Sequence, residues 1–273
     1  MSGGLALRLR AAPTFRLDLS PLTPERLAGQ SADAVARILL AYGRRSVPVG
    51  EWFDVRGSAD RQILIEGDAM RLDRIGADMQ DGQIRVEGNA GAYLGIGMRG
   101  GRIDVSGSVD AYAASGLTGG LVRIGAHAGD YLGAALPGEH RGMRGGVVIV
   151  GGSVGDRACD HMRRGLILVE GACGDYCGSR MQGGTIAMLG ACGARPGFSM
   201  RRGTLLFAGP APSPGPTFND AGALPLGFLV LLARSWKELP SRFASLSRLS
   251  TRVQRWVGDL AFGGQGELIH WPG

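Results

Sequence analysis

The sequence predicts an all-β protein: a right-handed parallel β-helix of about seven to eight coils, with short helical flanks at both ends. Three observations predict this fold. Glycine makes up 48 of the 273 residues, more than twice its ordinary share. A 19-residue pattern returns along the middle of the chain, and such a fixed period is typical of stacked repeats. Aromatic residues are 6% of a chain that is 44% hydrophobic, which suits a thin aliphatic core.

Each repeat begins at a methionine, or once at a leucine. The starts are spaced by 19, 19, 26, 19, 19 and 19 residues, so one repeat carries a seven-residue insertion within 135–142. A weaker copy at 61–76 precedes the first clear repeat, which brings the expected number of coils to about eight. The starts are Met79, Met98, Leu117, Met143, Met162, Met181 and Met200.

Within each repeat, aliphatic residues alternate with polar ones between glycines, as in Ile84-Arg85-Val86 and Ile103-Asp104. This alternation predicts a half-buried strand that stacks on the same strand of the next repeat. The glycines recur in three columns, and we expect all three to turn corners, where glycine adopts a positive φ without steric cost. The columns are Gly82, Gly101, Gly120, Gly146, Gly165, Gly184 and Gly203; Gly88, Gly107, Gly152, Gly171, Gly190 and Gly209; and Gly91, Gly129, Gly155, Gly174 and Gly193.

We expect three regions. Residues 1–50 form a lead-in and cap, in which Ser31 begins a short helix. Residues 51–209 form the β-helix. Residues 210–273 form a proline-rich linker and an amphipathic tail with helical spacing over 224–261.

The outward side of the strands changes character along the chain. Early repeats carry charged residues there, but later ones carry apolar residues. We therefore expect either the C-terminal segment or another chain to cover this face. The apolar outward positions are Ile149, Leu168, Ala187 and Leu206.

The basic residues are almost all arginines: Lys237 is the only lysine among 30 Lys and Arg, and the net charge is +6. They are scattered and have few aromatic neighbours, a pattern that disfavours nucleic-acid binding and favours an acidic partner. The chain has no stretch apolar enough to span a membrane and begins without a secretory signal. We therefore expect a cytoplasmic protein.

Cysteines and histidines do not predict a site. Cys159, Cys173, Cys177 and Cys192 lie within 34 residues, but without a Cys-x-x-Cys pair they are expected to be free core fillers. The four histidines share no column, and no nucleophile, P-loop or zinc motif occurs. No catalytic residue and no metal site are assigned, and we expect no cofactor bound by this chain.

Two columns of side chains stand out. Tyr93, Tyr112, Tyr131 and Tyr176, with Arg157 and Arg195 in the gaps, predict a ladder along one edge. A second column holds arginines next to the repeat starts, and their mutual repulsion favours an anionic ligand, either a carboxylate-rich chain of polyglutamate type or a partner protein. A solvated charged face is the alternative. These arginines are Arg99, Arg144, Arg163, Arg164, Arg201 and Arg202.

The repeats MRGGRIDVSGSV, MRGGVVIVGGSVGD, MRRGLILVEGACGDYCG and MQGGTIAMLGACG resemble a known family. They are similar to the C-terminal β-helix of glutamate synthase and more closely to the C subunit of formylmethanofuran dehydrogenase. The resemblance covers about 50–210, with a matching lead-in and tail. It implies a non-catalytic scaffold whose chemistry belongs to partners: a metal-dependent amidohydrolase-like subunit, a formyltransferase subunit and a dehydrogenase-B-like subunit.

The resemblance leaves two complexes open. One is a bacterial formyltransferase/hydrolase complex, in which formyl passes from tetrahydromethanopterin to a furan carrier, methylofuran or methanofuran, and leaves as formate. The other is a tungsten- or molybdenum-dependent formylmethanofuran dehydrogenase. The excess of arginine over lysine indicates a GC-rich genome and favours the bacterial complex. A stand-alone β-helix enzyme of acyltransferase or carbonic-anhydrase type is a third reading, disfavoured because such proteins use hexapeptide repeats and a histidine site.

Overall fold

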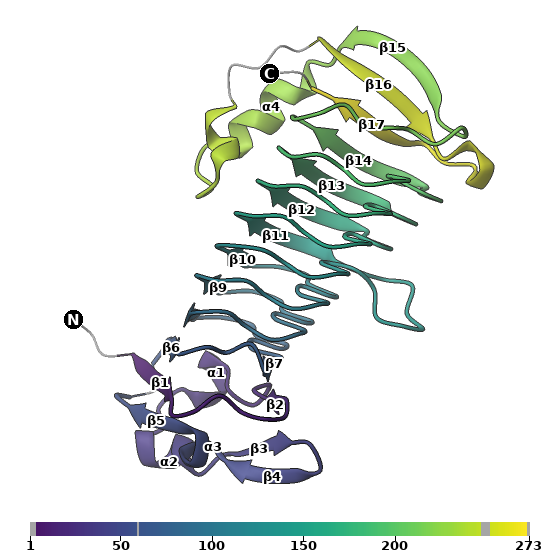
Figure 1. Cartoon of the computed structure of the whole chain (residues 1–273). Helices are drawn as coiled ribbons and strands as arrows, with labels where there is room; N and C mark the ends of the chain where they lie inside the picture. The colour runs from purple at the N-terminus through teal and green to yellow at the C-terminus, as the bar shows by residue number, and fades with distance from the viewer. Residues whose placement is uncertain (1–3, 59, 247–251, 272–273) are drawn as a thin grey trace.

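The computed structural model of the chain describes residues 4–58, 60–246 and 252–271. Over these residues the protein is mostly β, as predicted, and one long sheet of 13 strands dominates it. Figure 1 shows this sheet as a ladder of arrows along the molecule. Its order is β15 (Asn219–Pro225), β16 (Arg252–Gly258), β17 (Gly266–His270), β14 (Arg202–Phe207), β13 (Gln182–Met188), β12 (Arg164–Val169), β11 (Arg144–Val150), β10 (Leu121–Ile124), β9 (Arg102–Val105), β8 (Gln83–Glu87), β6 (Gln62–Glu66), β1 (Leu5–Leu9) and β5 (Phe53–Arg56).

The repeats form the middle of this sheet. Each one contributes a strand, and from β6 to β14 these strands pair in parallel. Equivalent residues lie side by side, so that Ile84 pairs with Ile103 and Ile103 with Val122. All three are fully buried, which confirms the aliphatic ladder. Isolated parallel bridges form a second line through Ala69, Ala90, Val109, Ala128, Val154, Cys173 and Cys192.

The three glycine columns serve two different purposes. The first column, from Gly82 to Gly203, has positive φ angles throughout, as predicted. Apart from Gly88, the other two columns do not, so the expectation that they also turn corners was wrong. They contain glycine because successive repeats approach too closely for a side chain. A Cβ on Gly174, for example, would lie 2.7 Å from the carbonyl carbon of Gly155.

The N-terminal region caps the first repeat. Strand β1 pairs in parallel with β6 and so extends the long sheet. Ser31 caps a helix as predicted, because its Oγ accepts a hydrogen bond from the backbone N of Ala34 at 3.2 Å. That helix ends at Ala36, earlier than expected, since the following apolar residues enter a strand. The remaining elements are α1 (Pro24–Leu27), α2 (Ala32–Ala36), α3 (Val49–Trp52) and a four-stranded sheet of β4 (Arg45–Pro48), β3 (Leu39–Tyr42), β2 (Leu17–Asp18) and β7 (Leu72–Asp73).

The C-terminal region is less helical than expected. Its helices are α4 (Phe228–Ser235) and the short 3₁₀ turns η1 (Arg242–Ser245) and η2 (Leu260–Phe262). The helical spacing of Val253 and Trp256 was misleading, because both lie on β16, which pairs antiparallel with β15 and β17. Strand β17 in turn pairs in parallel with β14 and closes the open edge of the last repeat. Among the described helices, none is long and apolar enough to cross a membrane.

The C-terminal segment covers the apolar outward face of the later repeats, as predicted. A second core forms there, separate from the core between the inward ladders. Trp236 is fully buried in it, and its ring packs edge-on against Phe243 with 5.3 Å between centroids. Figure 1 shows α4 lying across this end of the sheet. The covered residues Ile149, Leu168, Ala187 and Leu206 are at most 1% exposed.

Candidate functional site

The predicted arginine column lies along the start of the strands, but Thr118 stands between Arg99 and Arg144, and Gln182 between Arg163 and Arg201. We call its arginines and their neighbours the arginine strip: Arg99, Arg144, Arg163, Arg164, Arg201 and Arg202. Each repeat hydrogen-bonds to the one before it at this point. The backbone N of Arg163 donates to Met143 O at 2.9 Å, and that of Arg201 donates to Met181 O at 2.8 Å. In the adjoining column, Arg144 of β11 lies opposite Arg164 of β12. The sequence column aligned Arg144 with Arg163 instead, so the strands stack here with a one-residue shift, and a binding role of the strip stays a prediction.

The arginine strip carries uncompensated charge. None of its six side chains has an ion pair or side-chain hydrogen bond with another residue in the described part of the chain. Some arginines outside the strip are paired: Arg102, for example, contacts Asp104 through two hydrogen bonds of 2.5 and 2.8 Å. All members of the strip are exposed except Arg163, which is half-buried and whose Nε is buried without a partner. Like charges held side by side favour an anion from outside the chain.

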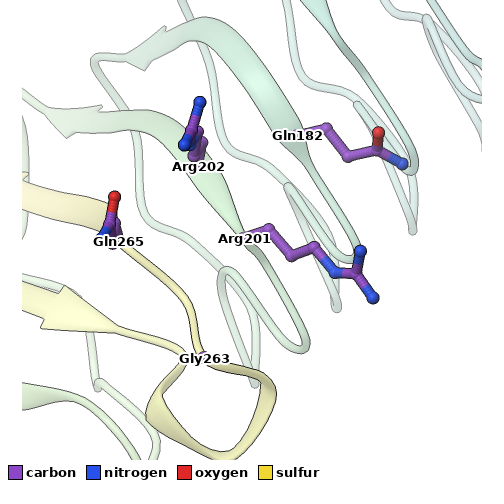
Figure 2. Close-up of a pocket in the computed structure, with 5 residues that line it drawn as sticks. All are labelled: Gln182, Arg201, Arg202, Gly263 and Gln265. Carbon is purple, nitrogen blue, oxygen red and sulfur yellow. The ribbon is translucent and has the colours of Figure 1, made fainter.

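Two neighbouring cavities lie at the C-terminal end of the strip. The first, of about 370 Å³, is the arginine cavity, lined by Gln182, Arg201, Arg202, Gly263 and Gln265. The second, of about 340 Å³, is the histidine cavity, lined by His140, His161, Arg180, Gln182, Ser199, Arg201 and Phe262. Gln182 and Arg201 line both. Figure 2 shows these two side chains projecting to the same side of adjacent strands.

The lining of the histidine cavity includes Arg180, which pairs with Asp160 behind it, and two imidazoles that sequence reasoning did not bring together. Asp160, almost fully buried, accepts hydrogen bonds from Ser179 Oγ at 2.8 Å and Arg180 Nε at 2.9 Å. The insertion places His140 against His161, with 5.6 Å between ring centroids. The two histidines belong to no common repeat column, so the only available signal was the insertion itself.

The imidazole of His161 is held in a desolvated and positively charged environment. Burial lowers its pKa, and the charges of Arg180, His140 and Arg163 lower it further, while Asp160 opposes them. Its Nδ1 is buried and has no hydrogen-bond partner among the described residues. A buried nitrogen without a partner is costly, so this Nδ1 requires a partner from outside the chain, such as a water molecule or a ligand.

The tyrosine ladder is confirmed. Tyr112 stacks on Tyr93 and on Tyr131, with ring centroids 5.5 and 4.6 Å apart. Further along, the guanidinium groups of Arg157 and Arg195 both lie over the ring of Tyr176, at 4.7 and 5.6 Å from its centroid. These residues stabilise one edge of the stack.

The four cysteines are free, and three of them are buried. Burial raises the pKa of the Cys159 thiol. A hydrogen bond with Cys177, together with burial, raises the pKa of Cys192. These thiols are therefore protonated at neutral pH and poor nucleophiles. Within the described residues, no group of three or more His, Cys, Asp or Glu could hold a metal ion.

Comparison with solved structures gives a match over nearly the whole chain. A chain of the formyltransferase/hydrolase complex (FhcABCD) from Methylorubrum extorquens, solved with methylofuran, superposes with a TM-score of 0.92 and 40% sequence identity. The match covers 98% of this chain and 99% of that one. At this identity and coverage the two chains are homologous throughout.

Curated relatives match over a shorter segment, about a third of their own length. The C subunit of the M. extorquens formyltransferase/hydrolase complex is 42% identical over 88 residues, which are 32% of this chain and 33% of that protein. The C subunit of the molybdenum-containing formylmethanofuran dehydrogenase 1 of Methanosarcina barkeri is 37% identical over 90 residues, or 31% and 30% of the two chains.

A family model supports the same relationship from the repeats alone. It is described as the GXGXG motif, and it matches residues 69–213. That range holds the glycine columns and the parallel ladder. The chain therefore belongs to the GXGXG family and is a homologue of the C subunit of the formyltransferase/hydrolase complex.

Proposed function

We propose that this chain is the non-catalytic scaffold subunit of a formyltransferase/hydrolase complex. Such a complex would transfer formyl from formyl-tetrahydromethanopterin to a furan carrier of the methylofuran type and release it as formate. One observation carries the proposal: a chain of the M. extorquens complex, solved with methylofuran, matches 98% of this chain at a TM-score of 0.92.

The fold supports a scaffold role. The parallel pairing at a fixed period and the second line of bridges support a right-handed parallel β-helix over 51–209, flanked by a cap over 1–50 and a covering segment over 210–273. A helix of this kind is rigid and presents long faces to neighbours. We infer that an amidohydrolase-like subunit with its metal, a formyltransferase subunit and a dehydrogenase-B-like subunit dock on it, and that the complex works in the cytoplasm.

The arginine strip is the proposed contact for acidic groups, either on a partner subunit or on a glutamyl chain of the carrier. Its support is the absence of any counter-charge for Arg144 and Arg163 within the described residues. Reversing both charges (Arg144→Glu with Arg163→Glu) should release a subunit or the carrier from the purified complex. Unchanged subunit content and carrier content would exclude this role.

Co-purification tests the scaffold function. A tagged chain expressed in its native host should elute with the three partner subunits, and formate release should require its presence. If the chain elutes alone, or if it shows activity by itself, the scaffold proposal is wrong and a stand-alone enzyme is favoured.

A formylmethanofuran dehydrogenase is the second candidate, favoured by the similarity to the C subunit of the M. barkeri enzyme. Metal analysis of the same purified complex separates the two. Stoichiometric molybdenum or tungsten, with formyl-dependent reduction of an electron acceptor, would indicate the dehydrogenase. Formate release without either metal would indicate the formyltransferase/hydrolase complex.

A further inference from the structure

We infer that the histidine cavity is a binding site for an oxyanion group, a carboxylate or a phosphate, and that the inserted loop at 136–142 completes it by carrying His140 over the cavity. This inference deepens the proposed role of the arginine strip, because Arg201 belongs to both. It differs in naming a discrete pocket rather than a charged surface.

The lining of the histidine cavity is positively charged. The guanidinium of Arg201 has no ion pair or hydrogen bond within the described residues, and no carboxylate among them lines either cavity. The carboxylate paired with Arg180, that of Asp160, is already engaged by Arg180 and Ser179. An unpaired guanidinium beside imidazoles that an anion can protonate is an arrangement that binds carboxylates and phosphates.

Three residues that line the histidine cavity have left-handed backbone conformations. His161, Arg180 and Ser199 occupy the same place in three successive repeats, each at a positive φ of 52 to 60°. Two of the earlier repeats have glycine there, at Gly97 and Gly116. A left-handed conformation is unfavourable for a residue with a side chain. Asp78 adopts the same conformation at this place in an earlier repeat, so the φ angle alone does not mark a site; what distinguishes His161, Arg180 and Ser199 is that all three line one cavity.

Two buried side-chain nitrogens at or beside the histidine cavity lack hydrogen-bond partners within the described part of the chain. Among the described residues, His161 Nδ1 is buried without a partner, and so is the Nε of Arg163, whose charge already lowers the pKa of His161. An anion beside His161 would relieve this repulsion and favour the imidazolium form. The adjoining arginine cavity, which shares Gln182 and Arg201, offers room for the remainder of a small molecule.

Titration of the histidines by NMR tests the site directly. The sequence has only four: His127, His140, His161 and His270. Inorganic phosphate or glutarate, added to the full chain at constant ionic strength with chloride as the reference, should shift the ring signals of His140 and His161 and raise their pKa. His127 and His270 should not respond. Phosphate alone would identify a phosphate site, and glutarate alone a carboxylate site. Equal shifts at all four histidines, or no shift with either probe, would overturn the inference.

Variants separate a pocket from diffuse attraction. Arg201→Gln and His140→Gln should each weaken binding of the effective probe, the first by about tenfold or more, because a charged hydrogen bond is lost. Arg123→Gln, an exposed arginine of β10 outside the strip, is the matched control and should bind normally. If Arg99→Gln weakens binding as much as Arg201→Gln, ions bind along the whole strip and the cavity is not a site. That result would leave the scaffold function untouched, since co-purification measures it separately.

Discussion

Gly174→Ala tests whether glycines in the middle of the repeats are required for stacking. The added Cβ would lie 2.3 Å from Asp156 Oδ1 and 2.7 Å from the carbonyl carbon of Gly155. Ordinary contact begins at 3.4 Å, so relieving the backbone contact requires the two repeats to separate by about 0.7 Å.

That separation would break identifiable hydrogen bonds. The backbone N of Gly174 donates to Val154 O at 3.1 Å, and a further 0.7 Å or so takes this pair beyond hydrogen-bonding distance. The displaced Asp156 side chain also loses the bond that it accepts from the backbone N of Asp175 at 2.7 Å. Two lost bonds at about 1 kcal/mol each, with overpacking of about 1–3 kcal/mol, predict a loss of roughly 3–5 kcal/mol.

Calorimetry of the full chain measures the loss. A change of this size lowers the Tm of a chain of this length by about 5–10 °C. The control is Gly227→Ala, where the added Cβ meets nothing within 4 Å and φ is −61°; it should leave the Tm unchanged or slightly raised. Adding Asp156→Ala to Gly174→Ala removes the side-chain clash but not the backbone clash, so it should not rescue stability. A Tm of Gly174→Ala within about 1 °C of the parent's would refute the stacking argument.

Three further changes give separate outcomes. Trp236→Ala opens the second core and should cost about 3–5 kcal/mol, seen as earlier proteolysis in the C-terminal region; parental resistance would show that this segment is not the cover. Tyr112→Ala removes two ring stacks at about 0.5–1.5 kcal/mol each, and Tyr112→Gly should recover part of the loss in urea unfolding because φ is 60°; a glycine variant no more stable than the alanine variant would contradict this. Arg16→Gln should destabilise the chain more at neutral pH than in acid. Burial raises the pKa of Asp73, although the Arg16 guanidinium at 2.8 Å opposes this. Without Arg16, the ionised Asp73 carboxylate therefore lowers the stability of the folded chain further above its usual pKa, and this loss disappears once the carboxyl is protonated. An equal loss of urea midpoint at both pH values would exclude this coupling.

The sequence predicts the repeat region well because equivalent positions of successive repeats are neighbours in the folded chain. When identical strands stack, a residue's neighbour above is its own equivalent, so the columns in the sequence are contacts in space. Ile84, Ile103 and Val122 form one such column, and Tyr93, Tyr112 and Tyr131 form another. The 19-residue period is enough to predict the contacts within both columns.

Where the period is interrupted, this logic no longer applies. The return path of the 136–142 loop is not encoded by any column, so the meeting of His140 with His161 could not be predicted. Val253 and Trp256 fit a helix by spacing alone, and only the open edge of β14 decides that this segment becomes strand. The second and third glycine columns exist as the sequence predicts. A column alone does not show, however, whether its glycines are needed for a positive φ or for the close approach of successive repeats.

The apolar face of the later repeats and the arginine strip differ in what covers them. Apolar outward residues such as Leu168 are covered by the C-terminal segment, because burial of hydrophobic area stabilises the folded chain by itself. The arginine strip has no counter-charge among the described residues, although acids pair with Arg102 and Arg180. Acids pair with only some of the arginines outside the strip, but the six of the strip stand in two adjoining columns, so their mutual repulsion adds no stability to the folded chain. The six unpaired side chains therefore support the proposal that an anionic ligand or partner binds the strip, and the buried Nδ1 of His161, which has no partner among the described residues, lies at the end of the strip where we expect the closest contact.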